Sequence, residues 1–477
     1  MRILQATSEF HPYSKTGGLA DMVAGLSGAL VEQGHEITVA TPLYRGIDDE
    51  LNNLKPLERE FQITLGKKNF PGRWWKTRAD SGVTVLFLEN KEFFDRAGLY
   101  MENGEGYWDN PERFMFLSKA VAELSADFDV VHVHDWQTAF VPMLLKLGSM
   151  KKMPGTMLTI HNLAYQGMCE GNRFEISNLP QRYFKREGPE FWGSLNFLKA
   201  GLHYADAITT VSPQYAKEIL TPEFGEGMDG VLRSRKNDLT GVLNGVDYGE
   251  WRTTGNPNLP ADYSSEDLSG KKACKEAVMD ELGLECSHLP LFGIVSRFAE
   301  QKGIGLLADT IESFLDAKQL QLVVLGKGDT KLVNRLIHIN NSYPSSASVQ
   351  VGYNAGLAHR IEAGSDFFLM PSRFEPCGLN QMYSLRYGSI PVVHAVGGLV
   401  DTIRDKPSKL GLANGIKFKH FTKEAIRVAI SSAIDIHQDQ KRLQNMIRAG
   451  MRDDYSWHKS AQIYGEIARN LHSHQRI

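Results

Sequence analysis

The sequence predicts an α/β protein with two doubly wound, Rossmann-type domains. Short apolar segments rich in β-branched residues alternate with helix-period segments along the chain, and this alternation is typical of βαβ units in a parallel sheet. The same pattern starts again in the second half. With 477 residues, the chain is also longer than one hydrophobic core usually supports.

In the first half, each predicted strand is short and ends at polar or small residues. Helix-period segments such as residues 20–33 and 111–124 separate these strands. The expected strands cover residues 3–6, 36–40, 83–88, 129–134 and 156–161.

In the second half, a similar series follows a segment rich in Thr, Asn, Pro, Ser and Asp. That segment, residues 252–272, is predicted to be a linker or loop, and the domain boundary is expected near residues 242–251. The second series of strands covers residues 289–297, 320–329, 348–353, 366–374 and 389–395.

Two further patterns concern helices. The sequence G-G-L-x-D occurs at residues 17–21 and again at 397–401, and its position after a strand in both halves predicts a shared turn geometry. Near the end, Ser456 is a suitable N-cap for an amphipathic helix. Its apolar positions would be Trp457, Ala461, Tyr464, Ala468 and Leu471.

The composition argues against several classes of partner. A net charge of −3 gives no basic excess for nucleic acid or an anionic membrane. No apolar run is long enough to span a membrane, and the N-terminal segment lacks the apolar core of a signal peptide. The four cysteines are scattered without metal-type spacing, so we expect a cytoplasmic protein with reduced thiols.

Ligands of open α/β sheets bind beyond the carboxyl ends of the strands, so polar residues at those positions are the first site candidates. In the first half these residues are Glu9, Lys15, Gly17, Gly18, Asp135 and His161. In the second half they are Ser296, Arg297, Lys302, Gly326, Gly328, Asp329, Tyr353, Arg373, Glu375, Cys377 and Gly378.

Arg297 and Lys302 suit a diphosphate, whose negative charge must be neutralised before it leaves; a solvated surface loop is the alternative. Gly326 and Gly328 would allow a ligand to approach the backbone closely. Tyr353 could stack on a base or pack in the core.

The segment 371–385 carries a more specific pattern. A helix is predicted to begin between Pro376 and Gly378, which would point the amides of Cys377, Gly378 and Leu379 at an anion. Glu375 could accept hydrogen bonds from sugar hydroxyls. A nucleophilic role for Cys377 would require a base and an acyl substrate, and no other feature indicates these.

The pair His132 and His134 lies on one face of a predicted strand, so a metal site is one interpretation. A polar His–Asp site at the strand end is the preferred alternative, because the chain reads as two sheets and not as one eight-fold barrel. The acidic "DFD" at 127–129 precedes its strand and therefore lies at the wrong end of the sheet.

Several motifs together closely resemble bacterial glycogen synthases and plant starch synthases. They are "KTGGLADM", "HVHDW", "TIHNLAYQG", "FLKAGLHYAD", "VLNGVD", "VSRFAEQKG", "LGKGD" and "PSRFEPCGLNQ". The resemblance covers essentially the whole chain. It implies the GT-B fold, with a deep cleft between the two domains, and retaining transfer of glucose from ADP-glucose to the non-reducing 4-hydroxyl of an α-1,4-glucan. No metal or other cofactor is expected.

The resemblance also implies a division of labour between the domains. Residues 1–244 would form the acceptor side and residues 245–456 the nucleotide-sugar side, with 457–477 a helix that packs back on the first domain. Domain closure would exclude water, and attack on the same face as the departing phosphate would retain the anomeric configuration.

The resemblance assigns roles to individual residues. Asp135 would position or deprotonate the acceptor, His161 would lie against the glucosyl unit, Arg297 and Lys302 would hold the diphosphate, and Glu375 would grip the glucose. The donor would also contact Lys15, Gly17, Gly18, Asn244, Gly326, Asp329, Tyr353, Cys377, Gly378 and Leu379.

Four positions depart from the expected pattern. Tyr383 replaces a second glutamate of the wider GT-B pattern, Asn380 and Val396 lie where phosphate contacts are expected, and Phe94 lacks a tyrosine hydroxyl. The alternatives are a GT-B enzyme with UDP-glucose or a non-glucan acceptor, a two-lobed sugar-binding protein, and a glucan phosphorylase. The last lacks a recognisable lysine context for pyridoxal phosphate.

Overall fold

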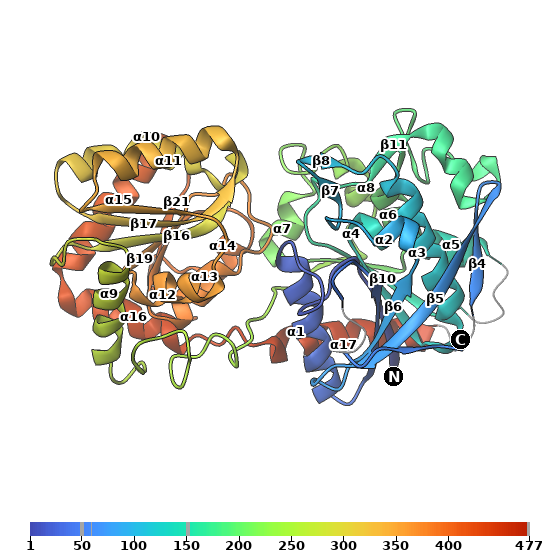
Figure 1. Cartoon of the computed structure of the whole chain (residues 1–477), viewed down its shortest axis with the longest axis horizontal. Helices are drawn as coiled ribbons and strands as arrows, with labels where there is room; N and C mark the ends of the chain where they lie inside the picture. The colour runs from blue at the N-terminus through green and yellow to red at the C-terminus, as the bar shows by residue number, and fades with distance from the viewer. Residues whose placement is uncertain (48–51, 59, 149–152, 475–477) are drawn as a thin grey trace. The chain divides into compact units, whose positions relative to one another are not determined.

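The computed structural model describes residues 1–47, 52–58, 60–148 and 153–474. The chain divides into two compact units, Met1–Gly245 with Trp457–Ile477, and Val246–Ser456. Each unit is an α/β structure built on a predominantly parallel sheet with helices on both faces (Figure 1).

The sheet of the first unit has ten strands among the described residues, in the order β15-β14-β10-β9-β1-β2-β6-β5-β3, with β4 paired to β5. The seven strands from β15 to β6 run parallel, and β5 pairs with β6 in the antiparallel sense. The bounds of the parallel strands are Arg2–Ala6 (β1), Glu36–Pro42 (β2), Thr84–Glu89 (β6), Val130–His134 (β9), Gly155–Ile160 (β10), Ala207–Thr210 (β14) and Leu239–Gly241 (β15). The antiparallel ones are Lys55–Pro56 (β3), Phe61–Leu65 (β4) and Lys68–Arg78 (β5).

The sheet of the second unit is parallel throughout, in the order β18-β17-β16-β19-β20-β21. Its strands are Leu291–Phe298 (β16), Gln321–Gly328 (β17), Ala347–Val351 (β18), Phe367–Met370 (β19), Ile390–His394 (β20) and Ile416–Phe418 (β21). The ten strands expected from the sequence are confirmed, with boundaries that shift by up to four residues at an end. The region 252–268 contains no helix or strand, and the helix α9 (Ser269–Glu281) follows it.

Both sheets have the strand order of a dinucleotide-binding fold, in which successive strands are added first on one side of the first strand and then on its other side. The order of strands therefore reverses beside that first strand. The reversal falls between β1 and β9 in the first unit and between β16 and β19 in the second. A ligand crevice in such a sheet opens at the carboxyl ends of these two strands. The fold therefore gives each unit one preferred place for a site.

The C-terminal helix α17 (Trp457–His474) returns to the first unit. Its predicted apolar positions, from Trp457 to Ala468, are buried with residues of β1, β2 and α1 (Gly18–Glu32) in one core cluster, against which Leu471 is partly buried. The terminal helix thereby completes the hydrophobic core of a sheet that begins more than 400 residues earlier.

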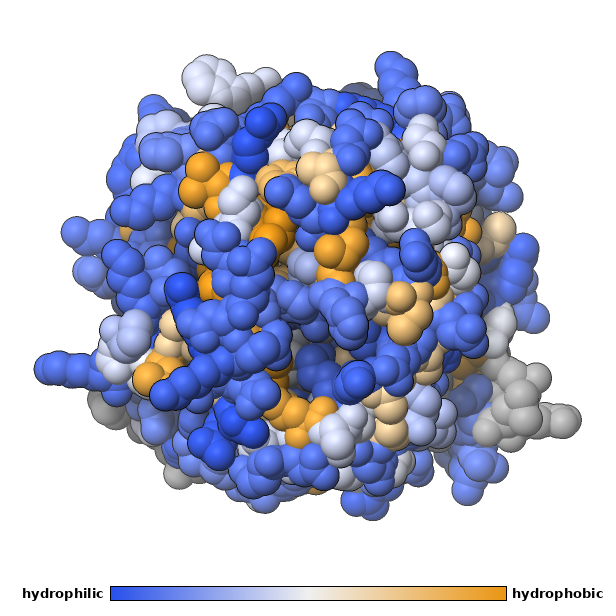
Figure 2. Space-filling view, turned by 90° about the vertical axis from the view of Figure 1, so that its left-hand side faces the viewer, coloured by the Kyte–Doolittle hydropathy of each residue, from blue (hydrophilic) through white to orange (hydrophobic). Residues whose placement is uncertain are grey.

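The described helices include no segment long and apolar enough to cross a membrane. The face of the second unit seen in Figure 2 is mostly hydrophilic, with hydrophobic residues in small separate areas.

Candidate functional site

In the first unit, the loop after β1 is organised around the buried carboxylate of Glu9. Glu9 accepts hydrogen bonds from the backbone N–H of Thr16 (2.5 Å) and of Gly17 (3.3 Å), from the Thr16 hydroxyl (2.6 Å) and from the hydroxyl of Tyr100 (2.6 Å). Gly17 is the N-cap of α1, which begins at Gly18. Glu9 thus fixes the glycine loop at the start of the helix, and Tyr100 ties it to a segment 91 residues away.

Lys15, beside this loop, has its ammonium 2.7 Å from the Asp21 carboxylate. Asp21, in the first turn of α1, therefore holds Lys15 next to the glycine loop. The side chain of Lys15 is about one-third exposed, so it remains accessible to an anionic ligand.

Asp135 follows β9 directly and is the first residue of the helical turn α4 (Asp135–Thr138), with φ of +54°. It accepts a hydrogen bond from the backbone N–H of His161 at 2.7 Å, across the ends of β9 and β10. Burial raises the pKa of Asp135 to about 7, against hydrogen bonds from the backbone of His161 and Asn162 that lower it. A carboxyl group of this kind changes charge near neutral pH.

Behind Asp135, three side chains form a chain of hydrogen bonds inside the sheet. Gln5 Oε1 lies 2.7 Å from His134 Nε2, and His134 Nδ1 lies 3.0 Å from His161 Nε2. Burial lowers the pKa of His161 to about 3 and holds the pKa of His134 well below its usual range, so both rings are neutral at pH 7. An amide oxygen only accepts hydrogen bonds, so His134 donates through Nε2 and accepts at Nδ1 from His161.

This arrangement leaves the Nδ1 atom of His161 with its lone pair. Gln5 therefore sets the tautomer of a ring that it does not touch. The strand face shared by His132 and His134 is confirmed, with ring centroids 4.1 Å apart. His132 bonds to the Thr159 hydroxyl instead (2.6 Å). Within the described residues, no group of three or more His, Cys, Asp or Glu side chains is placed to hold a metal ion.

Asn244 closes the first unit at its boundary. Its side chain is buried (7% exposed), and its Oδ1 atom has no hydrogen-bond partner among the described residues. A buried amide oxygen without a partner costs free energy unless a ligand or water supplies a donor. A sugar hydroxyl would supply one.

In the second unit, the residues predicted for the donor meet at the ends of β16 and β19. The Lys302 ammonium lies 2.6 Å from Glu375 Oε2, and the hydroxyl of Ser372 donates to the same oxygen (2.9 Å). Arg297, in β16, contacts the Gln301 side chain at 3.4 Å. Cation and carboxylate therefore stand side by side at the sheet reversal, Glu375 largely buried and Lys302 one-fifth exposed.

The helix predicted to begin between Pro376 and Gly378 begins later. α13 covers Asn380–Arg386, and residues 371–379 form a loop in which Gly378 has φ of +71°. The interpretation of Cys377 and Gly378 as helix-end amides is thus wrong, because both lie in the loop, whereas Leu379 is the N-cap of α13. Contact of these three amides with an anion stays a prediction. Asn380 instead donates to the carbonyl of Val295 (2.7 Å), which ties the helix to the end of β16.

The second G-G-L-x-D sequence holds this loop in place. A Cβ atom on Gly397 would lie 1.9 Å from the Glu375 carbonyl oxygen, and Gly397 has φ of +46°. The helix α14 begins at Gly397, whereas α1 begins at the second glycine of its pair, with Gly17 extended. The predicted shared turn geometry is therefore wrong. In the first glycine pair, the N–H of Gly17 donates to the Glu9 carboxylate. In the second pair, the missing side chain of Gly397 allows the loop that contains Glu375 to pack closely against it.

The other donor residues of the second unit are spread over neighbouring strand ends. Gly326 and Gly328 lie in β17, where a Cβ atom would collide with the backbone of β16. Strand packing thus explains both glycines without a ligand. Asp329 caps α11 (Thr330–Ser342) by accepting from the N–H of Lys331 (2.8 Å), and Tyr353 is largely exposed.

Two of the residues that depart from the expected family pattern, Val396 and Phe94, have buried side chains. Phe94 packs against Tyr44, with ring centroids 5.9 Å apart. Tyr383 stacks on Trp251 (3.7 Å, 5° between planes). These three side chains are packing residues in their own units.

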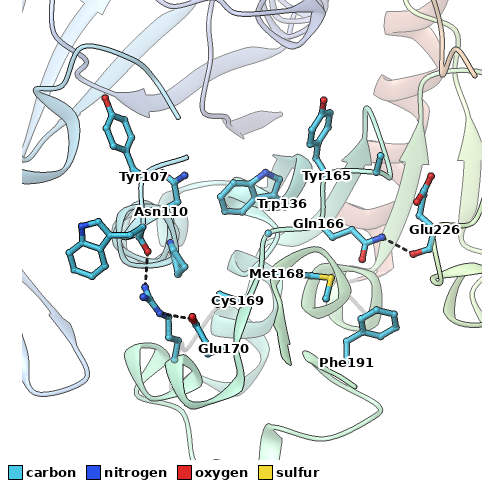
Figure 3. Close-up of a pocket in the computed structure, with 15 residues that line it drawn as sticks. Tyr107, Asn110, Trp136, Tyr165, Gln166, Met168, Cys169, Glu170, Phe191 and Glu226 are labelled. Atoms are coloured by element: carbon cyan, nitrogen blue, oxygen red, sulfur yellow. Dashed lines mark hydrogen bonds and ion pairs between the residues drawn. The ribbon is translucent and has the colours of Figure 1, made fainter. Parts of the chain in front are cut away.

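Sequence reasoning missed a pocket of about 680 Å³ in the first unit (Figure 3). Aromatic rings surround it: Trp136 follows Asp135, while Tyr107 and Tyr165 stand on either side in the figure. Its lining residues are Tyr107, Trp108, Asn110, Pro111, Trp136, Ala164, Tyr165, Gln166, Gly167, Met168, Cys169, Glu170, Arg173, Phe191 and Glu226. Aromatic faces beside polar side chains suit a sugar, which has apolar C–H faces and hydroxyl edges.

Comparison with known proteins identifies the family to which this two-unit α/β chain is similar. The family model described as "Starch synthase catalytic domain" matches residues 2–234, and "Glycosyl transferases group 1" matches residues 286–452. Curated glycogen synthases from Anaeromyxobacter sp. (strain Fw109-5) and Myxococcus xanthus (strain DK1622) are 45% and 43% identical, each over 99% of both chains. The chain belongs to the glycogen synthase and starch synthase family.

Solved structures match as well. The catalytic domain of starch synthase IV from Arabidopsis thaliana, bound to ADP and acarbose, superposes with a TM-score of 0.90 at 30% identity over 99% of each chain. Sucrose-phosphate synthase from Thermosynechococcus elongatus has a TM-score of 0.63 at 15% identity, which indicates the shared fold alone. The expected family and GT-B fold are therefore confirmed. The individual site residues remain predictions.

Proposed function

We propose that this enzyme transfers glucose from ADP-glucose to the non-reducing 4-hydroxyl of an α-1,4-glucan, with retention of the anomeric configuration. The observation that carries the proposal is the pairing of Lys302 with Glu375 at the sheet reversal of the second unit. The starch synthase IV relative was solved with a nucleoside diphosphate and an oligosaccharide analogue, which supports both substrate classes.

In the proposed reaction, the bond between the anomeric carbon and the diphosphate oxygen breaks as positive charge grows on the sugar. Lys302 and Arg297 neutralise the departing ADP, and Lys15 is a further donor contact in this proposal. The acceptor 4-hydroxyl attacks the same face of the sugar, and its proton passes to the departing phosphate oxygen. Glu375 and Asn244 bind glucose hydroxyls.

Asp135 and His161 position the acceptor and the glucosyl unit. The aromatic pocket of the first unit, next to Asp135 through Trp136, receives the glucan chain. The reaction requires that water be kept from the bound donor, which it would otherwise hydrolyse. A cytoplasmic location is part of this proposal, because ADP-glucose is an intracellular type of substrate and the cysteines are scattered.

The test offers ADP-glucose or UDP-glucose together with maltooligosaccharides and measures nucleotide release and chain lengthening. We expect preferential ADP release and an α-linked product by proton NMR of the new anomeric centre. Preferential UDP release would reassign the donor. A β-linked product or a trapped glycosyl–enzyme adduct would overturn the retaining, same-face mechanism.

A further inference from the structure

A highly solvent-exposed tryptophan lies at the tip of a tight hairpin in the first unit. The strands β12 (Glu190–Phe191) and β13 (Ser194–Asn196) pair in the antiparallel sense, with Phe191 opposite Ser194. Only Trp192 and Gly193 connect them, with φ of +51° and +83°. Trp192 is 89% exposed.

This residue is unusual for its position. A two-residue hairpin loop with positive φ at both positions favours Asn-Gly or Asp-Gly, and a bulky residue there is an outlier. The hairpin itself is well held, since the Gly193 N–H donates to the Glu190 carboxylate at 2.8 Å. The strained indole leaves most of its surface in solvent, and such outliers are candidates for function.

The hairpin continues one wall of the aromatic pocket. β13 also pairs with β11 (Met168–Glu170), whose residues line the pocket together with Phe191. The ring of Phe191 lies edge-on to that of Trp192, with centroids 6.4 Å apart. The series of aromatic side chains thus extends from the pocket to the hairpin tip.

The pocket lining itself includes a second exposed indole. Trp108, 77% exposed, lies over the guanidinium of Arg173 at 5.6 Å. Arg173 also binds the Trp108 carbonyl at 3.0 Å and the Glu170 carboxylate at 3.0 Å. The pocket lining therefore combines the Trp108 ring with the hydrogen-bonding groups of Arg173 and Glu170, and Trp192 stands at the tip of the hairpin that continues its wall.

We propose that Trp192 stacks on a glucosyl unit of a polymeric α-glucan that extends beyond the pocket. The inference rests on the proposed function. It adds that the enzyme binds a polymeric glucan through a contact that a short oligosaccharide does not reach. A sugar ring presents an apolar C–H face of the size of an indole. A protein partner would need a larger continuous apolar area, whereas the chain around Trp192 holds the partly buried Phe191 together with Glu190, Gly193 and Ser194.

The test compares three forms of the full chain: wild type, Trp192→Asn and Trp192→Tyr. Asparagine suits the positive φ of the turn and removes the ring, so the hairpin is retained. Tyrosine keeps a ring. Steady-state kinetics are measured with ADP-glucose and either maltose or glycogen as acceptor, and glycogen binding is measured by affinity electrophoresis without donor.

For Trp192→Asn we expect the KM for glycogen to rise roughly three- to tenfold, as loss of one aromatic stacking contact implies. Retardation in the glycogen gel should weaken by a similar factor. The KM and kcat with maltose should stay within about twofold, and Trp192→Tyr should recover most of the glycogen effect.

An equal change with maltose and glycogen, or no change with glycogen, would overturn the inference. So would a change of oligomeric state in Trp192→Asn, measured by light scattering, without a glycogen effect, because the indole would then serve a second copy of the chain. If the wild type transfers no glucose, the proposed function fails, while the donor-free gel still reports whether Trp192 binds glycogen.

Discussion

Replacing Lys302 by methionine separates the catalytic role of this lysine from its structural one. The substitution keeps much of the side-chain volume and removes the ammonium that lies 2.6 Å from Glu375. The proposed leaving group then loses a cation at the point where negative charge develops. Removal of one such preorganised group typically lowers turnover by roughly 10²- to 10³-fold, and we expect that loss in kcat with ADP-glucose.

The same change leaves Glu375 as a carboxylate with 7% of its side chain exposed and no ammonium partner. Loss of a charge-assisted hydrogen bond to a buried group costs about 1–3 kcal/mol. The Ser372 hydroxyl still donates to the same oxygen, so we expect the lower part of that range in the free energy of unfolding.

The double variant Lys302→Met with Glu375→Gln distinguishes the two effects. Without the carboxylate, no buried charge is left unpaired, so stability should return to within about 0.5 kcal/mol of wild type while turnover stays low. The assays are urea unfolding followed by fluorescence and ADP release in a coupled reaction. Lys331→Met, which removes an exposed lysine of α11, is the matched control and should change neither quantity.

Two results would refute this reasoning. Turnover of Lys302→Met within tenfold of wild type would remove Lys302 from the departure of ADP. Parallel recovery of turnover and stability in the double variant would show that neither the Lys302 ammonium nor the Glu375 carboxylate is needed for glucose transfer.

Three further predictions follow from the geometry. Gly397→Ala places a Cβ atom 1.9 Å from a carbonyl of the neighbouring loop and should lower the melting temperature by several degrees. Gly17→Ala, with nothing within 4 Å, should shift it by less than about two degrees; equal shifts in calorimetry would contradict the packing argument. The folded-state pKa of Asp135 is raised from 3.8 to about 7, so its burial destabilises the protein progressively as pH rises from about 4 to 7. Asp135→Asn should therefore gain more thermal stability at pH 8 than at pH 4, and wild-type turnover should increase through pH 7; a flat difference between the two pH values would count against the shift. Gln5→Leu removes the acceptor that sets the His161 tautomer and should lower kcat about tenfold, the value of one hydrogen bond of about 1.4 kcal/mol. Its unfolding midpoint should fall, because the buried Nε2–H of His134 loses the Gln5 acceptor at 2.7 Å; nitrogen shifts of His161 in NMR check the tautomer directly.

Ten strands of the two sheets could be predicted because parallel strands are buried on both faces. The strands β3, β4, β5, β14, β15 and β21 were not predicted. Segments such as residues 320–329 and 389–395 are almost continuously apolar, and that signal is local. The positions of Asp135, Lys302 and Glu375 were predicted for a related reason, since a polar residue directly after such a strand lies at the edge where ligands bind. Their assigned roles came from resemblance to a family.

Some predictions failed because they depend on contacts between residues far apart in the chain, which a short stretch of sequence does not reveal. The loop 371–379 was predicted to start a helix, but Gly378 adopts a positive φ and Gly397 allows another loop to pack against it. The close packing of β16 against the glycines of β17 could not be predicted either, and it explains both glycines without a ligand. Their contact with the donor stays a prediction.

By itself, the sequence determined the two-sheet architecture, the boundary region and the strand ends that carry charge, because hydrophobic periodicity and strand-end polarity are properties of consecutive residues. Only the tertiary structure decided that Glu9 binds Tyr100, that Gln5 reaches His161 through His134, and that aromatic rings gather around one pocket. These contacts join residues far apart in the chain, and the packing of the whole unit selects them from many pairings that the same residues could form.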